Sequence, residues 1–453
     1  MLADIGLIAG VALLIWLALK GVNILLAVLI SAVVIGVTNA MPLADVLLKY
    51  FPTGPSGAFT FAGNFLLLFL CGALFGRVMA ASHAAQGVAM GITARLGARH
   101  TLLIAMLVCA LLTYGGVVVF VVMFTMYPIG VTLMRQANLP RRLYAAAIAL
   151  GAGTFTMTAL PGTPSIHNVI AARSLGTDLF AGGWYGVLGG LLMAVLGMWY
   201  LQQQWRQAQA NGEGYQSHPK DEQMAALAPT ADQQLPNLGK SLLPVAVVLF
   251  IIVLPRLLQL AEVQAQWLLF AASQPVIWSS MALLAGVASC YLLFAPARQN
   301  FMQTMGQGAD DSLLPLINTA AVIGFGGVVI QTAGFHSFAQ WLLELPMPPL
   351  LSVFFSANLI SGVTASASGG LQIFMSALAP AYLEAGIPAE LLHRVANIAA
   401  GGLDSLPHSG AVIALLTLMG LTHKQAYKNI FVVTVLIPMV AALAVVITAM
   451  LVG

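Results

Sequence analysis

The sequence has few charged residues for its length. Asp, Glu, Lys and Arg make up 7% of the 453 residues, whereas 60% are hydrophobic. A soluble domain carries roughly 25% charged residues, so this balance excludes an ordinary soluble enzyme and predicts an all-α polytopic membrane protein in a lipid bilayer. The net charge of +3 is too small to indicate nucleic-acid binding, and we expect no nucleic-acid partner.

Several chemical motifs are also missing. No GxxxxGK[ST] phosphate loop occurs, which argues against ATP use by this chain. Neither HExxH nor CxxC occurs, and the three cysteines, Cys71, Cys109 and Cys290, lie in apolar runs where small buried side chains are expected. We therefore expect no metal and no cofactor. The N-terminus lacks the basic region and cleavage site of a signal peptide, and it is typical of a first membrane helix.

Two apolar stretches are interrupted by Gly, Pro and polar residues. The stretch 391–420 contains the run GGLDSLPHSG at 401–410, and the stretch 141–173 contains a weaker copy between Gly151 and Ser165. A break facing lipid would leave backbone groups unpaired, so such breaks survive only inside protein or beside a water-filled cavity. Two broken helices at corresponding places in two halves are the sequence pattern of a transporter binding site.

The order of segments repeats, which predicts two halves, 1–202 and 241–453, joined by a hydrophilic cytoplasmic linker, 203–240. Each half contains one interrupted apolar segment, and we expect 101–139 and 350–384 to form re-entrant hairpins. Windows long enough to span the hydrocarbon core predict the remaining helices. They lie near 3–19, 22–40, 58–80, 181–202, 241–260, 277–295, 312–330 and 428–450.

The hairpin model gives each half about five crossings, so the second half is inverted relative to the first. With both termini external, all but four of the 17 Lys and Arg residues fall on the cytoplasmic side, as the positive-inside rule requires. The four exceptions are Lys49, Arg173, Arg256 and Arg394. We expect Arg173 and Arg394, at the outer ends of the broken helices, to be interface anchors.

Hairpin tips and broken helices both place helix N-termini at mid-membrane, where free N–H groups and a partial positive charge can hold a carboxylate. The candidate substrate-binding residues at the tips are Thr113, Tyr114, Gly115, Gly116, Thr364, Ser366, Ser368, Gly369 and Gly370. Those at the breaks are Thr154, Gly162, Thr163, Ser165, His167, Asn168, Ser405, His408 and Ser409. Alternatively, these small residues only permit close helix packing.

Asp404 is the single one of the 14 acidic residues at the centre of an apolar stretch. An ionisable residue inside the membrane is a functional candidate because its burial costs at least about 2.5 kcal/mol. Asp404 could carry a proton, bind a cation or cap the following half-helix. His408 lies four residues further on, and a histidine is suited to proton coupling. A structural hydrogen bond is an equally good interpretation for His408 and for His167.

The second break and the residues after it, GLTHK at 420–424 and AYK at 426–428, resemble the gluconate permease (GntP) family of bacterial proton symporters. They are most similar to the branch described as D-beta-hydroxybutyrate permeases. The run LPGTPSIHN at 160–168 resembles the matching segment and a motif of the wider ion transporter superfamily. Two positions depart from the family pattern, because Ser409 replaces an Asn and His167 replaces a Gln in many relatives.

The resemblance implies a multi-pass protein of the bacterial inner membrane, with a scaffold domain that forms a homodimer and a transport domain that moves as an elevator. It also implies proton-coupled uptake of a small organic anion, with a hydroxy monocarboxylate such as 3-hydroxybutyrate as our first choice. Gluconate or another sugar acid, and sodium in place of the proton, are alternatives. A passive organic-acid channel is a weaker one. A membrane hydrolase using Asp404, Ser405 and His408 is disfavoured because they crowd on one break, so we expect no enzyme.

Overall fold

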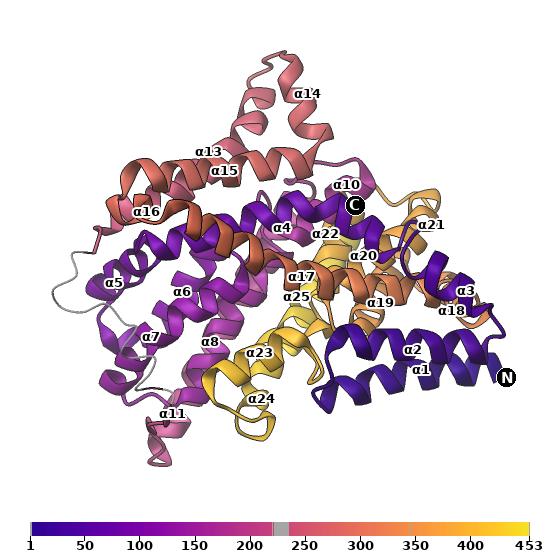
Figure 1. The fold of residues 1–453 in the computed structure, drawn as a ribbon, viewed down its shortest axis with the longest axis horizontal. Coiled ribbons are helices and arrows are strands. Elements are labelled where there is room, and N and C mark those ends of the chain that lie inside the picture. The colour runs from indigo at the N-terminus through magenta and orange to yellow at the C-terminus, as the bar shows by residue number, and fades with distance from the viewer. Residues whose placement is uncertain (1, 220, 222–234, 345, 453) are drawn as a thin grey trace.

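The computed structural model describes residues 2–219, 221, 235–344 and 346–452, and every regular element in these ranges is helical (Figure 1). Seven described helices are long and apolar enough to cross a membrane, and α22 with α23 forms an eighth candidate if this bent pair is one span. The seven are α4 (Ala58–Ala81), α7 (Val119–Ala137), α11 (Gly183–Ala210), α13 (Leu238–Leu260), α15 (Pro275–Leu293), α17 (Phe301–Val329) and the continuous run His423–Val452. The chain is therefore an all-helical polytopic membrane protein.

Shorter helices complete the fold. Before residue 200 they are α1 (Leu2–Leu19), α2 (Ile24–Thr38), α3 (Leu43–Asp45), η1 (Val46–Tyr50), α5 (Ala84–Leu96), η2 (Ala98–His100), α6 (Thr101–Tyr114), α8 (Arg141–Gly153), α9 (Phe155–Thr158) and α10 (Ile166–Leu175). Later they are α14 (Gln266–Ser273), α16 (Ala295–Arg298), α18 (Ala333–Glu344), α19 (Pro349–Thr364), α20 (Ala367–Ala377), α21 (Ala379–Glu384), α22 (Ala389–Ala400), η3 (Leu403–Ser405) and α23 (Gly410–Met419). The run His423–Val452 comprises α24 (His423–Phe431), the π-helical η4 (Val432–Leu436) and α25 (Ile437–Val452).

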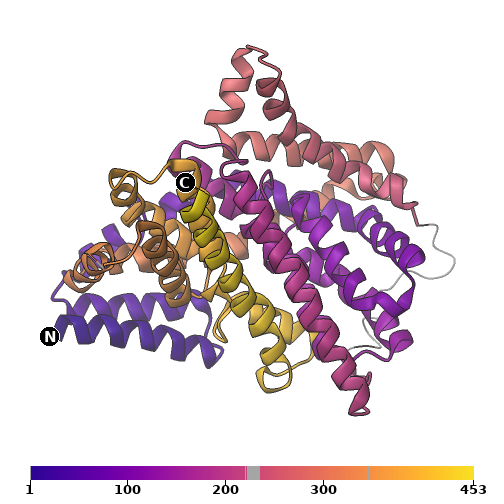
Figure 2. The same cartoon turned by 180° about the vertical axis from the view of Figure 1, so that it is seen from behind.

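Two long helices, α4 and α17, pack side by side through the middle of the molecule (Figure 1). Gly308 on α17 permits this approach, because a Cβ atom there would lie 3.0 Å from Leu74 of α4. The pair α1 and α2 lies along one edge, and α15 covers α4. Figure 2 shows α11 and α25 packed along each other on the opposite face. Small residues at helix contacts are the usual basis of close packing in membranes.

The first predicted break is present between α8 and α10. Helix α8 ends at Gly153, the short α9 follows, and residues 159–165 are not helical before α10 begins at Ile166. Pro161 and Pro164 explain why no helix continues, since proline lacks the N–H of the helical hydrogen bond. Gly162 adopts a φ of +76°, a backbone conformation that favours glycine.

The second predicted break separates α22 from α23, and the two helical segments are bent by 51°. Between them lie the short 3-10 turn η3 and Pro407. Gly401 packs against the first break, because a Cβ atom there would lie 2.8 Å from Thr158 Cγ2. Gly402 packs against α19, where a Cβ atom would lie 1.9 Å from Asn358 Oδ1. These glycines therefore let the two breaks and α19 approach one another closely.

The two segments predicted as hairpins each contain a sharp interruption between helices. In 101–139, residues 115–118 separate α6 from α7, and the two helices contact each other. In 350–384, Ala365 and Ser366 separate α19 from α20, which also pack together. The Ser366 side chain caps α20 by accepting a hydrogen bond from Gly369 N at 3.2 Å.

Helix bounds differ from the sequence prediction in four places. Helix α17 begins at Phe301 rather than near 312, and α11 extends to Ala210 rather than ending near 202. Residues 43–50, which lie outside the predicted helices, are helical, and α14 was not predicted. In α17 and α11 the added turns are rich in polar or small residues, which a hydropathy window scores poorly although they continue the helix. Of the predicted linker 203–240, residues 220 and 222–234 lie outside the described residues.

Residues 211–219 and 221 pack against the ends of α7 and α8. Asp221 is fully buried and lies 2.5 Å from Arg141 Nη2, and it accepts further hydrogen bonds from the hydroxyls of Tyr127 and Tyr215. Arg141 also donates to the carbonyl oxygen of Met419 at the end of α23. This cluster therefore attaches the start of the predicted linker to both broken helices.

Candidate functional site

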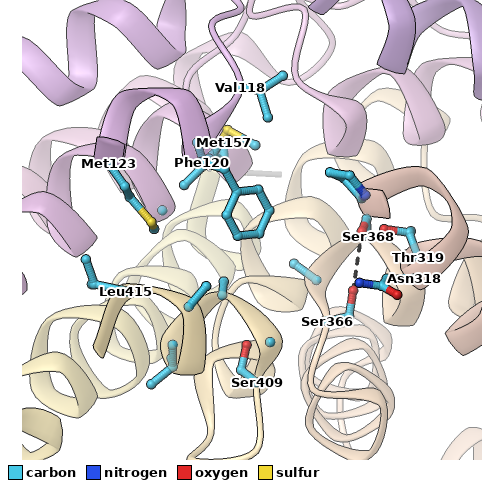
Figure 3. A pocket seen from close by; sticks show the side chains of 18 of the residues that line it. Val118, Phe120, Met123, Met157, Asn318, Thr319, Ser366, Ser368, Ser409 and Leu415 are labelled. Atoms are coloured by element: carbon cyan, nitrogen blue, oxygen red, sulfur yellow. Dashed lines mark hydrogen bonds between the residues drawn. The ribbon is translucent and has the colours of Figure 1, made fainter. Parts of the chain in front are cut away.

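A cavity of about 1160 Å³ lies where the second broken helix, α7, α17 and the α19–α20 turn come together. Figure 3 shows Phe120, Met157 and Leu415 on its apolar side, and Ser366, Ser368, Asn318 and Thr319 on its polar side. Ser409 from the second break faces the same space (Figure 3). A few convergent polar groups in a largely apolar cavity are typical of a site for a small molecule.

Three helix N-termini line this cavity. They are the starts of α7 at Val119, of α20 at Ala367 and of α23 at Gly410. Val118 and Ser409, the residues before α7 and α23, cap neither helix with a side-chain hydrogen bond. The first N–H groups of α7 and α23 are thus free of side-chain caps. The dipoles of all three helices add partial positive charge at the same cavity. The arrangement can hold an anion without a basic side chain.

Hydroxyl and amide side chains supply the polar lining. Ser366 Oγ and Ser368 Oγ lie 3.3 Å apart, and Thr364 Oγ1 donates to the carbonyl oxygen of Ile360 at 3.0 Å. Asn318 and Thr319 of α17 lie beside these serines on the same side of the cavity (Figure 3). Such groups can both donate to and accept from the hydroxyl of a bound molecule.

Asp404 lines the cavity from the turn η3. Its Oδ1 accepts a hydrogen bond from Ser405 Oγ at 3.0 Å, and Tyr427 fixes the same turn by donating to the carbonyl oxygen of Ser405. Within the described residues, no Lys, Arg or His forms an ion pair with Asp404, and no three His, Cys, Asp or Glu side chains gather as a metal site. A carboxyl group without a cationic partner is costly to keep ionised away from water.

Two histidines also line the cavity, one from each broken helix. His167 and His408 are 8% and 6% exposed. Among the described residues, His167 Nδ1 and His408 Nε2 have no hydrogen-bond partner. A buried ring nitrogen without a partner is available to a bound ligand or a proton.

Eight of the predicted site residues therefore meet around one cavity. They are His167, Thr364, Ser366, Ser368, Asp404, Ser405, His408 and Ser409. They come from both broken helices and from the α19–α20 turn, as the sequence pattern indicated.

The structure places the other predicted residues of the first half beside the cavity, where they hold the first break. Thr113 Oγ1 lies 2.9 Å from Thr156 Oγ1, and the Tyr114 hydroxyl donates to the carbonyl oxygen of Pro161 at 2.8 Å. Thr154 Oγ1 donates back to the carbonyl oxygen of Leu150. These side chains use their hydrogen-bonding groups within the protein.

The other predicted site residues of the first break, apart from His167, are also absent from the cavity lining. Asn168 Nδ2 donates to the carbonyl oxygens of Thr163 and Leu179, and Ser165 caps α10 at Asn168 N. Gly162 packs against the ring of Phe180. Thr163 is buried, and its hydroxyl has no hydrogen-bond partner among the described residues.

The four predicted tip glycines serve close packing outside the cavity lining. A Cβ atom would meet Val245 at Gly115, Leu283 at Gly116, Val322 at Gly369 and Ser361 at Gly370, each within 3.0 Å. Gly115 and Gly116 follow the end of α6, and α7 begins only at Val119. Gly369 and Gly370 lie in the first turn of α20.

Arg394 is not the interface anchor that the sequence suggested. It is fully buried and donates hydrogen bonds to the carbonyl oxygens of Ala159, Leu179 and Ala181. It therefore joins α22 of the second half to the first break. Arg173 is exposed and contacts Asn64 on α4.

Several lining residues were missed by the sequence analysis. Arg77, Asp310 and Asp311, which the sequence analysis did not single out, all line the cavity. Asn318 and Thr319 carry a signal that could have found them, because two adjacent polar residues interrupt the apolar face of a long helix. Phe120 and Met157 carry no such signal, since apolar residues are expected throughout these helices.

Comparisons with known proteins agree with this architecture. The chain is 37% identical over 395 residues to the uncharacterized transporter YxjC of Bacillus subtilis (strain 168), covering 82% of this chain and 83% of the relative. It is 25% identical over 336 residues to the high-affinity gluconate transporter of Escherichia coli (strain K12), covering 71% of this chain and 69% of that protein. The crystal structure of the Alcanivorax borkumensis YdaH transporter has a similar fold, with a TM-score of 0.50, 13% identity and 97% coverage of both chains.

A family model described as GntP family permease matches residues 2–452, which is nearly the whole chain. With its many apolar helices, and with relatives that are transporters, the chain belongs to the GntP permease family of membrane transporters.

Proposed function

We propose that this protein is a secondary active transporter that carries a small hydroxy monocarboxylate, such as 3-hydroxybutyrate, together with a proton across the bacterial inner membrane. The observation that supports this most is that three helix N-termini and the Asp404 carboxyl group, which has no ion-pair partner among the described residues, meet at a single cavity. The first feature suits an organic anion, and the second suits a coupled cation.

In this proposal the substrate carboxylate faces the N-termini of α7, α20 and α23. Its hydroxyl group hydrogen-bonds with Ser366, Ser368 or Asn318, which lie on the polar side of the cavity (Figure 3). Its short carbon chain packs against Phe120 and Met157 on the apolar side. Each part of a hydroxy acid thus has a matching part of the cavity.

Asp404 is the proposed proton carrier. When it is protonated, the loaded site carries one negative charge fewer, which lowers the cost of moving that site through a low-dielectric environment. His408 lies on the same break and has an unpartnered ring nitrogen, so it can pass a proton between Asp404 and water. In the sodium alternative, Asp404 and the carbonyl groups of the break would bind the cation instead.

The identity of the acid rests on the balance of the lining. The Escherichia coli relative is named as a gluconate transporter, and gluconate remains the alternative substrate. Gluconate carries a hydroxyl group on nearly every carbon atom. Burying those groups against Phe120, Met157 and Leu415 would leave several of them without partners, which is costly. The lining therefore favours an acid with one hydroxyl group.

The proposed transporter has an inverted-repeat topology and an elevator-type movement. We infer two inverted halves, 1–202 and 241–453, with α6–α7 and α19–α20 as re-entrant hairpins and both termini external. The cavity lining includes Ala18, Ile24 and Ala80, which lie at helix ends that this topology places toward the cytoplasm. The broken helices and hairpins would move together as an elevator against a scaffold that dimerises.

Transport by the purified protein in liposomes tests the function. We expect accumulation of labelled 3-hydroxybutyrate when an inward proton gradient is imposed, and less accumulation of gluconate under the same gradient. A sodium gradient at constant pH should have no effect. Equilibration without accumulation would contradict the symport proposal and indicate a channel, whereas a response to sodium alone would select the sodium-coupled alternative.

A further inference from the structure

The cavity contains one basic side chain whose role the proposed function does not use. Among the described lining residues, Arg77 is the single Lys or Arg, whereas Asp310, Asp311 and Asp404 are acidic. Arg77 lies four residues before the end of α4, and Asp311 lies on α17 opposite it. For a cavity that is to receive an anion, the position of this one cation is a significant feature.

Arg77 and Asp311 form an ion pair inside the cavity. Arg77 Nε lies 2.9 Å from Asp311 Oδ2, and the two side chains are 38% and 39% exposed. Within the described residues, this Nε atom has no hydrogen-bond partner, so its contact with Asp311 is an ion pair without a well-aligned hydrogen bond. A guanidinium group can bind a carboxylate through two parallel N–H groups, so the single contact with Asp311 leaves part of this capacity free.

The packing around Arg77 fixes where its charge lies. A Cβ atom on Gly308 would lie 3.4 Å from Arg77 Cβ, so the stem of Arg77 is packed directly against α17. Ala80 and Gln86 line the cavity near it in the chain, at the end of α4 and the start of α5. The ion pair thus lies on the part of the cavity wall where α4 and α17 meet.

We propose that Arg77 is a second carboxylate-binding position in the cavity, held by Asp311 when no substrate is present and taken over by an organic acid on its way to or from the helix N-termini. This inference rests on the proposed function and adds a residue that determines affinity for the carboxylate group. Asp311 acts as an internal competitor, because it resembles the part of the substrate that Arg77 recognises.

The exchange conserves the number of ion pairs. The incoming carboxylate forms an ion pair with Arg77, and the Asp311 carboxylate becomes hydrated in the half-exposed cavity. Because a partly exposed ion pair contributes little to stability, its opening costs little. A buried pair could not exchange in this way, since separating it would leave an uncompensated charge.

A double-mutant comparison separates this role from a structural one. Binding of 3-hydroxybutyrate, lactate and gluconate is measured on the purified full-length protein, wild type and variants, with methyl 3-hydroxybutyrate as the probe that lacks a carboxylate. We expect R77Q to weaken acid binding at least tenfold and D311N to strengthen it about threefold. The double variant R77Q/D311N should bind acids at least fivefold more weakly than the wild type. Binding of the ester should not change.

Two further variants serve as controls. Arg256 pairs with Asp178 at 3.2 Å outside this cavity, so R256Q removes a comparable ion pair and should leave acid binding unchanged. R77K keeps the charge and should bind acids more tightly than R77Q. If the pair only braced α4 against α17, D311N would weaken binding as much as R77Q, and the double variant would bind acids about as weakly as either single variant. Weaker acid binding by D311N than by the wild type would therefore overturn the inference.

The binding assay and the uptake assay together distinguish failure of this inference from failure of the proposed function. Normal proton-driven uptake without the expected pattern at Arg77 would overturn the inference alone. The expected pattern at Arg77 in a protein that accumulates no acid would overturn the proposed function alone. Failure of the wild-type protein to bind any of the acids would overturn both.

Discussion

His393 on α22 lies 2.8 Å from Asn168 on α10, measured between Nε2 and Oδ1. Asn168 Nδ2 donates to two carbonyl groups, so Oδ1 is the acceptor and His393 Nε2 carries the hydrogen. His393 Nδ1 can then accept from the Thr177 hydroxyl at 2.7 Å. One chain of hydrogen bonds therefore joins the broken helices of both halves, next to the hydrogen bonds of Arg394.

The first prediction concerns this contact. His393→Leu leaves the buried Asn168 Oδ1 and the half-buried Thr177 hydroxyl without this partner, which should lower the free energy of unfolding by about 2 kcal/mol. Thermal unfolding of the purified protein in detergent measures the change. His336 is exposed on α18, and His336→Leu is the matched control with no expected effect. Equal melting temperatures for both variants would show that the contact does not stabilise the fold.

The second prediction concerns Asp404. Asp404→Asn keeps the size and polarity of the side chain but cannot release a proton, so accumulation driven by a proton gradient should be lost. Exchange of labelled for unlabelled substrate at equal pH should continue, because it needs no net proton movement. Glu262 is exposed between α13 and α14, and Glu262→Gln should behave like the wild type. Full proton-driven accumulation by Asp404→Asn would rule out the proton role.

The third prediction concerns stability and pH at Asp221. Burial would raise the pKa of this carboxyl group, but hydrogen bonds from Tyr215, Tyr127 and His218 N, with the charge of Arg141, hold the pKa below its ordinary value. A lowered folded-state pKa stabilises the protein above the unfolded-state pKa, near 3.9, and this stabilisation disappears as the pH falls through the folded-state value. Asp221→Asn should thus cost about 3 kcal/mol near neutral pH.

Melting curves between about pH 8 and pH 3 check this expectation, since the gap between wild type and Asp221→Asn should be constant at high pH and close below about pH 4. Glu213→Gln is the control. Glu213 pairs with Arg142 at 2.6 Å but is 38% exposed, so its loss should cost about 1 kcal/mol or less. A gap at Asp221 that widens with acid would contradict the assigned direction of the shift.

The fourth prediction concerns substrate size. Phe120 faces the cavity from the first turn of α7 (Figure 3), and Phe120→Ala would extend the apolar side of the cavity. We expect the ratio of uptake of 3-hydroxyhexanoate to that of 3-hydroxybutyrate to rise at least about tenfold, the lower end of the effect of one methylene group in a hydrophobic pocket. Phe124→Ala, one turn further along α7, tests whether the effect depends on position. An unchanged ratio in Phe120→Ala would place the carbon chain elsewhere.

The sequence predicted the two breaks because their cause is local. Proline removes a backbone donor wherever it occurs, and the polar run at 401–410 cannot face lipid in any fold. The positions of Asp404 and His408 at the cavity follow directly from that break. The resemblance to the GntP family was visible in the same residues.

Other parts of the site depended on packing that the sequence does not display. Asn168 and Thr113 have the chemistry of site residues, but their hydrogen-bonding groups are used by neighbouring segments. In the sequence Arg77 resembles an ordinary charge at a helix end, because its ion pair with Asp311 forms only where α17 packs against α4. Arg394 resembled an interface anchor because the carbonyl groups that bind it come from segments more than 200 residues away in the chain.

Pro315 lies within α17, between the acidic pair and Asn318. Proline has no N–H group to offer the carbonyl oxygen four residues earlier, which here belongs to Asp311. Bending α17 at this point therefore breaks one hydrogen bond fewer than bending it elsewhere. The N-terminal part of this helix, which carries Asp310 and Asp311, can therefore tilt relative to the later turns that carry Asn318 and Thr319.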